Sequence, residues 1–577
     1  MINVFDDIVK NESRIQNSEF NIMPESNTFD AIVVGSGISG GWAAKELCEK
    51  GLRTLMLERG HNVEHIKDYT TANKTPWEIQ HRGRLSSEEK NRYPIQTRHY
   101  SIGEDNKQFY VLDKENPYTE IQRYDWVRAD VLGGRSLLWA RMSFRWSDLD
   151  FEANIKDGHG ADWPIRYKDL APWYDYVERF VGISGKAEGI PHLPDSQFQA
   201  PMEMNCVEMV MKEKLESTYS DRKLIHGRIA NLTQPLQARN KCQYRNLCHR
   251  GCPFGAYFST QSSTLPAAMK TGKLELKTGM IVNRVIYEDK SGTAKGVEVV
   301  DRESGKTYEY YARLIFLNAS TVATTFLLLN STGNRFPQGL GNNNDIVGRH
   351  LMDHHKSGSV NGDVDGYTDK YYYGRRPTGI YIPRFSNLTE KQGSFLRGYG
   401  CQGGASRGRK TAEGIGASFK ESITELGGWR FGLTAFGETL PYQENRITLN
   451  KEVKDKWGRP TLNIDCSFKE NEKKMHEDMI TSMKEMMENL GAKNIRHDGT
   501  MSFPGNANHE MGTARMGNDP KTSVLNKWNQ VHDAKNVFIT DGSCMASTSC
   551  VNPSLTYMAI TARAVDHAVS EMKKGNL

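Results

Sequence analysis

The chain has 577 residues, with 75 Lys and Arg against 70 Asp and Glu, and a hydrophobic share of 37%. The net charge of +5 is close to neutral for this length, so no nucleic-acid partner is expected. The sequence contains no apolar run of about 18 residues, and we expect no membrane span. The N-terminus shows no basic stretch followed by an apolar one, so we expect no secretion signal of its own. The protein is expected to be cytoplasmic, or periplasmic through export on a signal-bearing partner subunit.

The N-terminal region predicts a complete βαβ unit. Residues 29–34 (FDAIVV) form an apolar, β-branched run of the kind found in buried parallel strands. A GxGxxG turn at 35–40 follows at once, a helix is predicted over 41–51, and a second strand over 52–57. Glycine-rich turns in this context bind the phosphates of a dinucleotide, so the unit predicts nucleotide binding.

Each glycine of the turn has an expected physical role. Gly35 permits the tight turn, Gly37 lets a pyrophosphate approach the backbone, and Gly40 lets the helix pack closely on the strand. Glu58 lies eighteen residues after the last glycine, where an acidic side chain usually accepts the ribose hydroxyls. Arg59, the next residue, is a further candidate for cofactor binding.

The rest of the chain predicts a mixed α and β protein. After residue 60 the pattern becomes irregular, with a second glycine pair inside 130–146. Alternating or buried apolar runs predict further strands, and helical spacing predicts two more long helices. The predicted strands are 274–288, 295–300, 313–320 and 536–543, with β-like stretches within 355–465; the predicted helices are 469–490 and one beginning near Pro553.

Several separated motifs together resemble the glucose–methanol–choline (GMC) oxidoreductase family. They are the N-terminal glycine turn, HEMGTARMG at 509–517, NVFITDGS at 536–543, and an Asn-Pro pair about 43 residues after His509. VGRHLMDHH at 347–355 and ENRITL at 444–449 are also similar to segments of that family. The resemblance implies noncovalent FAD as the cofactor, which the βαβ unit alone does not specify.

The resemblance also implies an architecture. The fold class expected is an α/β flavin-binding domain, Rossmann-like and built from discontinuous segments, plus an α+β substrate domain on an antiparallel sheet. The flavin-binding segments are expected at 1–165, 226–345 and 496–577, and the substrate-domain segments at 166–225 and 346–495.

Oxidation of an alcohol requires that the hydroxyl proton leave, and histidine has a suitable pKa for the base. By resemblance His509 is that base and Asn552 holds the alcohol oxygen while hydride departs to the flavin N5. Asp541 and Gly542 are expected to contact the flavin phosphates or ribityl chain, although Asp541 could equally cap a helix.

Further cofactor contacts are expected in two other segments. Gly133, Gly134 and Ser136 form the second glycine-rich turn, and Val282 lies in a predicted strand. Some sugar-oxidising family members attach FAD through a histidine at the position that Leu138 occupies here. This substitution is the reason for expecting FAD without a covalent link.

Cys242, Cys248 and Cys252 form a C-x5-C-x3-C-P cluster among nine scattered cysteines. The thiols could hold an iron–sulfur cluster, a zinc ion with His249 as fourth ligand, or no metal. Family resemblance implies a 3Fe–4S cluster, as in GMC sugar dehydrogenases that pass electrons to a cytochrome.

The expected function is therefore FAD-dependent oxidation of a sugar or glycoside hydroxyl, at C3 of a glucoside, with a cytochrome c or quinone as electron acceptor. The alternatives are a gluconate or glucose dehydrogenase and a choline-type small-alcohol oxidase. A non-catalytic electron-transfer subunit is disfavoured, because a relay needs no base. The aromatic and basic segment 371–376 (YYYGRR) could contact a sugar or be an ordinary strand.

Overall fold

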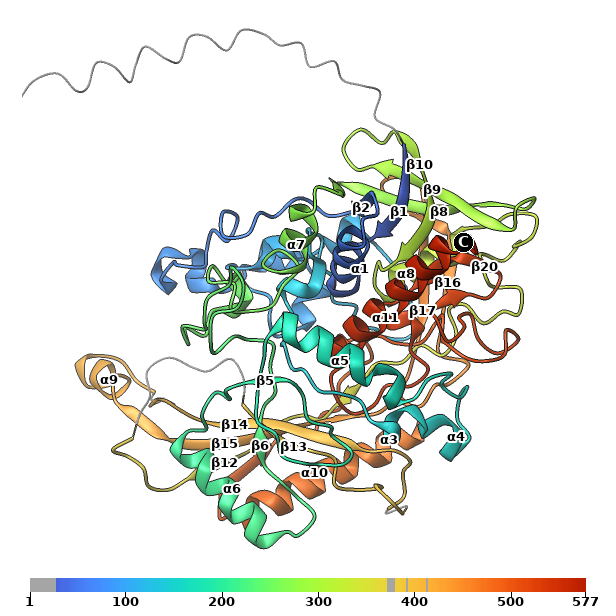
Figure 1. Ribbon diagram of the computed structural model, residues 1–577. Coiled ribbons are helices and arrows are strands. Elements are labelled where there is room, and N and C mark those ends of the chain that lie inside the picture. The colour runs from blue at the N-terminus through green and yellow to red at the C-terminus, as the bar shows by residue number, and fades with distance from the viewer. Residues whose placement is uncertain (1–26, 371–378, 391–392, 411–412) are drawn as a thin grey trace, which may run out of the picture.

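The computed structural model describes residues 27–370, 379–390, 393–410 and 413–577. Two large β-sheets organise this part of the chain, one in the upper and one in the lower half of Figure 1. The segment 371–376, considered above as a possible sugar contact, lies outside the described residues.

The upper sheet has eight strands and draws on both ends of the chain. Its main path runs β19-β20-β10-β1-β2-β7, and β9 and β8 continue from β10 as an antiparallel meander. The pairings of β20, β10, β1, β2 and β7 are all parallel. The strands are β1 (Thr28–Val34), β2 (Thr54–Glu58), β7 (Leu274–Thr278), β8 (Met280–Glu288), β9 (Thr293–Asp301), β10 (Thr307–Leu317), β19 (Gln530–Val531) and β20 (Ala534–Ile539).

Both faces of this sheet are covered, which is why β1 is apolar at nearly every position. Ala31 and Val33 pack in a cluster with α1 (Ile38–Glu49) and the C-terminal helix α11 (Ser554–Lys573). Ile32 and Val34, which point the other way, belong to the largest core cluster of the protein. The predicted strand–turn–helix–strand unit is therefore present, with the helix beginning three residues earlier than expected.

The lower sheet has seven antiparallel strands, in the order β18-β12-β15-β14-β13-β6, with β11 also paired to β15. Its members are β6 (Ile225–His226), β11 (His355–Lys356), β12 (Val360–Val364), β13 (Ile380–Ile382), β14 (Tyr399–Arg409), β15 (Leu426–Gly437) and β18 (Lys493–His497). Helices α6 (Cys206–Thr218) and α10 (Glu470–Asn489) cover it. Met475, Met479, Met483 and Met486 of α10 recur at helical spacing and are fully buried against the sheet.

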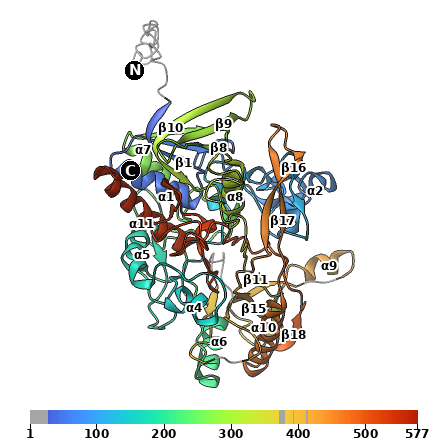
Figure 2. The same ribbon diagram turned by 90° about the vertical axis from the view of Figure 1, so that its right-hand side faces the viewer.

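Two details differ from the sequence expectation. The single strand expected at 274–288 breaks at Gly279, whose φ of +70° favours glycine, because β7 pairs with β2 whereas β8 pairs with β9. Strands β16 (Arg446–Lys454) and β17 (Pro460–Asp465) do not join the lower sheet; they form a three-stranded sheet with β3 (Thr119–Glu120). Figure 2 shows this hairpin on the right of the molecule, beside β8 and β9.

The helices outside the lower sheet are grouped mainly around the upper one. α5 (Tyr167–Val181) packs on α11, so it lies with the core of the upper sheet, whereas the sequence places 166–225 in the expected substrate domain. The others are α2 (Ser87–Arg92), α7 (Thr264–Lys270) and α8 (Thr321–Asn330). α3 (Asp148–Phe151) and α4 (Ala153–Asp157) lie in the lower half of Figure 1, and α9 (Ala417–Ser422) projects from the end of the lower sheet.

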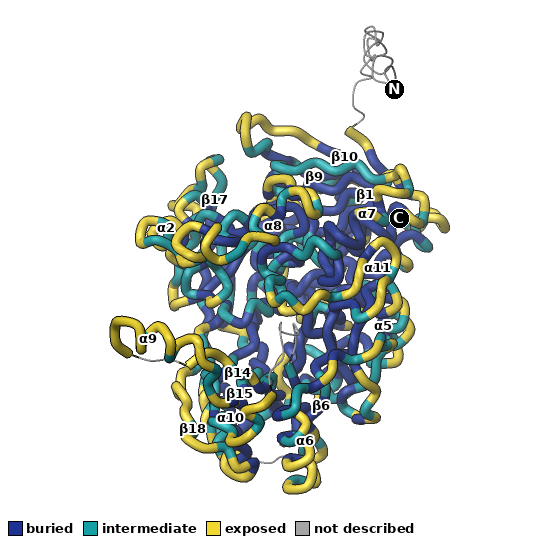
Figure 3. The backbone as a smooth tube through the Cα atoms, turned by 90° about the vertical axis from the view of Figure 1, so that its left-hand side faces the viewer, coloured by how far each residue is buried: buried dark blue, intermediate teal, exposed yellow. Residues whose placement is uncertain are grey.

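The strands of the upper sheet are mostly buried, whereas α9, α2 and the ends of the lower layer are exposed (Figure 3). Among the helices of the described ranges, none is both long and apolar enough to cross a membrane.

Candidate active site

A cavity of about 410 Å³ lies where the upper sheet meets the lower one. Its size is typical of a ligand site, for which volumes of roughly 300–1,000 Å³ are usual. The ends of β1 and β2 line one side, and side chains from β11, β14 and β15 line another. A ligand in this cavity would touch both sheets.

The glycine-rich turn after β1 lies on the cavity wall. Gly35 has φ +90°, and a Cβ there would lie 2.5 Å from the Asn318 carbonyl oxygen, so only glycine fits. A Cβ on Gly40 would lie 1.8 Å from the Gly35 carbonyl oxygen, which explains the close packing of helix and strand. A Cβ on Gly37, by contrast, would meet no protein atom within 4 Å. Gly37 therefore leaves space for a ligand beside the start of α1.

Glu58 lies at the end of β2 and faces the same turn. Its carboxylate accepts hydrogen bonds from the Ser36 amide (3.1 Å), the Ser36 hydroxyl (2.5 Å) and the Gly60 amide (2.7 Å). Burial raises the pKa of Glu58, and these three donors oppose that rise. A buried carboxylate with fixed donors can accept ribose hydroxyls in a defined orientation. Arg59 contacts Asn116 and lies 3.4 Å from Asp130.

The predicted catalytic and cofactor-binding residues line this one cavity, except for two. Gly40 and Gly133 lie behind its wall, and the φ of +83° at Gly133 favours glycine there. Those that line it are Gly35, Gly37, Glu58, Arg59, Gly134, Ser136, Val282, His509, Asp541, Gly542 and Asn552.

The cavity fits a dinucleotide on three structural grounds. The first turn of α1 presents its amide groups, which suit a pyrophosphate. Gly37 and Gly134 face each other without side chains. The buried side-chain amide nitrogen of Asn318 borders the cavity and has no hydrogen-bond partner among the residues that the structure describes. Leu138 also lines the cavity, and its side chain cannot form a covalent bond to a flavin.

The position of Asp541 is compatible with both of its expected roles, a helix cap and a cofactor contact. It caps the short helix at 542–544 by accepting the Ser543 amide at 3.0 Å, and it accepts the Thr324 hydroxyl at 2.6 Å. Burial raises its pKa. The capping role is therefore observed, and contact with a cofactor remains a prediction.

His509 and Asn552 are brought together at the cavity, and the protonation of His509 follows from its neighbours. The His354 Nε2 lies 2.8 Å from the Ser549 carbonyl oxygen, and a carbonyl only accepts, so Nε2 carries the proton. Neutral His354 then accepts at Nδ1, and the His509 Nδ1, 2.9 Å away, is the donor. The lone pair of His509 is consequently on Nε2.

Asn552 faces that lone pair. Its Nδ2 lies 3.3 Å from the His509 Nε2, and its Oδ1 accepts a hydrogen bond from the Gln402 side chain at 2.8 Å. The amide of Asn552 is therefore oriented by the lower sheet, since Gln402 belongs to β14. A basic nitrogen and an amide donor converge on one point of the cavity wall.

The protonation state of His509 suits a base. Burial lowers its pKa well below the ordinary value of 6.5, and His354, Arg135 and Lys356 lower it further. The loop that carries His509 is anchored because Asp353 accepts the backbone amides of His509 (2.9 Å) and Ala507 (3.1 Å). The imidazole is thus neutral and fixed in place at neutral pH.

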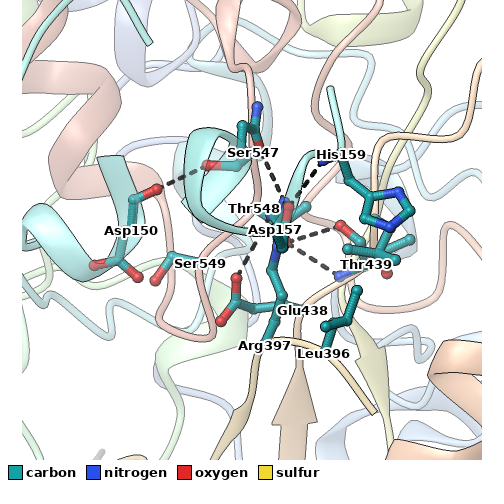
Figure 4. A network of polar contacts seen from close by, with 12 residues as sticks. Asp150, Asp157, His159, Leu396, Arg397, Glu438, Thr439, Ser547, Thr548 and Ser549 are labelled. Carbon is teal, nitrogen blue, oxygen red and sulfur yellow. Dashed lines mark hydrogen bonds and ion pairs between the residues drawn. The ribbon is translucent and has the colours of Figure 1, made fainter. Parts of the chain in front are cut away.

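The carbonyls that orient His354 are themselves held by a polar network (Figure 4). Ser549 has a φ of +55°, and the preceding Ser547 hydroxyl donates to the Asp150 carbonyl at 3.2 Å. Thr439 follows the end of β15; it donates its amide to the Thr548 hydroxyl (3.1 Å) and its hydroxyl to the Asp353 carbonyl (2.5 Å). Thr439 therefore connects the segment that contains His354 with the segment that contains its acceptors.

His354, Gln402 and Lys356 are functional candidates that the sequence did not single out. His354 and Lys356 lie in or next to the VGRHLMDHH segment, whose resemblance to the family was the one available signal. Gln402 lies in a glycine-rich strand without a motif, and only the folded sheet places it beside Asn552.

Cys242, Cys248 and Cys252 line one small cavity, and all three are free thiols. Burial raises the pKa of Cys242, and the other two thiols raise it further. His249 faces away from them, since its Nε2 lies 3.0 Å from the Asp105 carboxylate. Within the described part of the chain, no three His, Cys, Asp or Glu side chains are arranged to hold a metal ion.

A dinucleotide turn and a neutral histidine–asparagine pair on one cavity define an oxidoreductase that uses a nucleotide cofactor. Family models described as GMC oxidoreductase match residues 29–356 and 441–561. The chain belongs to the GMC oxidoreductase family.

Relatives of known name cover nearly the whole chain. The 2-methyl-1,2-propanediol dehydrogenase of Mycolicibacterium austroafricanum is 30% identical over 93% of this chain and 94% of its own. The fructose dehydrogenase large subunit of Gluconobacter japonicus is 26% identical, over 96% and 99%. The structure of pyridoxine 4-oxidase from Mesorbium loti shares the fold, with a TM-score of 0.60 at 16% identity over 94% and 99% of the two chains.

Membership in the family makes the chain an FAD-dependent oxidoreductase that acts on alcohol or sugar hydroxyls. The predicted family, enzyme class and FAD cofactor are confirmed, as are a flavin-binding domain and a sheet-containing substrate domain. The particular substrate and the electron route remain predictions.

Proposed function

We propose that the protein is a dehydrogenase that oxidises a secondary hydroxyl of a sugar or glycoside to a ketone, at C3 of a glucoside. The observation that carries the proposal is the orientation of His509, whose lone pair on Nε2 borders the cavity beside the Asn552 amide. The names of several relatives, which include a fructose dehydrogenase and a gluconate 2-dehydrogenase, support a sugar or sugar-acid substrate.

The residues of the chain account for the proton. His509 Nε2 accepts the hydroxyl proton of the substrate, and Asn552 donates a hydrogen bond to the same oxygen. His354 keeps the His509 proton on Nδ1, so the accepting nitrogen faces the cavity. Bound FAD, held by the glycine turn and Glu58, supplies the acceptor for the hydride that leaves the carbinol carbon.

The test measures anaerobic reduction of the bound flavin, which is observed as the loss of its visible absorbance (bleaching). Methyl glucoside, a disaccharide, glucose, gluconate and choline are compared, and the product is identified by NMR. A 3-keto glucoside supports the proposal, whereas bleaching by choline alone supports the small-alcohol oxidase. His509→Ala should lower the rate of bleaching by the true substrate by about 10²–10⁴-fold. Bleaching at the normal rate in His509→Ala removes this residue from the mechanism.

We also propose that the three clustered cysteines hold an iron–sulfur cluster that carries electrons toward a cytochrome or quinone. Three free thiols on one cavity support it, because thiolates are the usual ligands of such clusters. Their present arrangement is not a metal site, so we assign no geometry to the cluster. Protein purified without oxygen should contain iron and acid-labile sulfide, and Cys248→Ser should remove them. Iron-free protein with full cytochrome-linked activity contradicts this part.

A multi-subunit setting is part of the same proposal. One relative is by name the large subunit of a dehydrogenase, which supports a multi-subunit enzyme. For this chain we propose a small signal-bearing partner and a cytochrome c acceptor. The location would then be periplasmic, and a cytoplasmic location is the alternative. Copurification from the native cell, followed by fractionation, distinguishes the two.

A further inference from the structure

Lys356 is a cation in the active-site cavity for which the described residues provide no anionic partner. It lies on β11, borders the cavity and is half-buried. Its ammonium lies 5.6 Å from the centre of the Tyr100 ring, and no carboxylate lies within ion-pair distance of it among the residues that the structure places. Tyr100 is 83% exposed, so this end of the cavity opens toward solvent.

The other cationic side chains on the cavity wall already have partners. Arg59 lies 3.4 Å from Asp130, and Arg128 pairs with Asp113. Arg135 forms an ion pair with Glu510, and Arg459 forms one with Asp455. Arg141 donates to the Asn231 side chain and the Trp139 carbonyl. Lys356 therefore supplies a positive charge that, within the described part of the chain, has neither an ion pair nor a side-chain acceptor and that a ligand in the cavity would meet.

The carboxylates nearest to Lys356 do not neutralise it by contact. Burial has the largest effect on the pKa of Lys356 and lowers it, while the charges of Asp353 and Asp125 partly oppose that lowering. Asp353 is occupied by the amides of the His509 loop. Asp125 is paired with Arg98 and Arg123. The histidine on the other side, His99, is neutral because burial lowers its pKa to about 3.

Lys356 also lies on the face of the sheet that points at the catalytic pair. It pairs in register with Phe436 of β15, whose ring centre lies 6.4 Å from that of His509. Gln402, which orients Asn552, borders the same cavity from β14. The positive charge thus lies near the reacting position but toward the open end, where the far part of a substrate would lie.

We propose that Lys356 binds a carboxylate of the substrate, so that the enzyme prefers a polyhydroxy acid, such as a glycoside of a uronic acid, to its neutral counterpart. This inference rests on the proposed sugar oxidation and specifies its substrate class. The same charge disfavours amino sugars and quaternary ammonium alcohols, because a second cation would lie in a partly desolvated site beside the first. A single ammonium matches a singly charged carboxylate.

The experiment compares substrates that differ only in charge. The wild type, Lys356→Met, Lys356→Arg and a control at an exposed lysine, Lys454→Met, are mixed anaerobically with methyl glucoside and with methyl glucosiduronate. The measured quantity is the ratio of kcat/KM for flavin reduction by the acid to that by the neutral glycoside. The Kd of the acid for the oxidised enzyme, from tryptophan fluorescence, separates binding from chemistry.

The wild type should favour the acid, and Lys356→Met should lower the ratio by about 10- to 150-fold, which corresponds to a lost charged hydrogen bond of about 1.5–3 kcal/mol. Lys356→Arg should retain most of the ratio, and Lys454→Met all of it. A wild type that favours the neutral glycoside, or a ratio unchanged in Lys356→Met, overturns the inference. If neither glycoside reduces the flavin of the wild type, it is the proposed function that fails.

Discussion

The orienting role of His354 can be tested by replacing it with residues that keep or lose its hydrogen bonds. In the wild type the His354 Nδ1 lies 2.9 Å from the His509 Nδ1, and the His354 Nε2 lies 2.8 Å from the Ser549 carbonyl oxygen. In His354→Leu the His509 Nδ1–H loses this acceptor and the Ser549 carbonyl loses this donor. The side chain of His354→Gln offers its amide oxygen to the His509 Nδ1–H and its amide NH₂ to the Ser549 carbonyl, so it can restore both hydrogen bonds.

The expected size of the effect follows from the cost of an unpaired buried donor, about 1–3 kcal/mol. The His509 proton is then no longer confined to Nδ1, and the form with a free Nε2 becomes less populated. The rate of flavin reduction should fall by roughly 5- to 140-fold in His354→Leu, from that free energy converted at about 1.4 kcal/mol per tenfold. His354→Gln should recover most of the loss.

The assay is stopped-flow flavin bleaching under anaerobic conditions, with the limiting rate and the substrate Kd taken from the same series. An orienting role predicts a fall in the limiting rate with little change in Kd, and equal FAD content in all variants. If His354→Leu bleaches at the wild-type rate, or if Gln is no better than Leu, the assigned direction of the hydrogen bonds is wrong.

Three further predictions concern the base and the cofactor. Because the pKa of His509 lies well below 6.5, kcat/KM should stay constant as the pH falls through 6.5, and a half-loss near that pH would show that the base is not held neutral. Gly37→Ala should weaken FAD binding but leave the melting temperature of the apoprotein unchanged, because the added methyl group meets no protein atom. Gly40→Ala should lower that melting temperature, because its methyl group would collide with the Gly35 carbonyl. Equal melting temperatures of the two variants would contradict this packing. Acid precipitation should leave the flavin in the supernatant, since Leu138 cannot link to it; yellow pellets would show a covalent bond elsewhere.

The sequence predicted best where one short segment contains the whole physical requirement. The strand, the glycine turn and α1 are local, and the steric demands on Gly35 and Gly40 match the roles expected of them. His509 and Asn552 came from a spaced motif, and the structure places their side chains 3.3 Å apart.

What the sequence could not predict depends on contacts between distant segments. The orientation of His509 requires His354 and the Ser549 carbonyl, and Ser549 is 195 residues from His354 along the chain. The free charge of Lys356 is visible only once the carboxylates around it have found other partners. The break at Gly279 likewise reflects two different neighbouring strands and no change in local hydrophobic pattern.

The pairing of the two chain ends in one sheet has a consequence for biosynthesis. Ala43, Ala44 and Leu47 of α1 pack on Ala564, Val565 and Ala568 of α11, which the ribosome makes much later than α1. At roughly 5–20 residues per second, the nascent N-terminal half waits on the order of 25–100 s for the helix that covers it. During that interval its apolar face is open to solvent, so recombinant yield should depend on chaperone supply and on slow translation at low temperature. Removal of residues after about 550 should leave an insoluble chain and not a smaller active one.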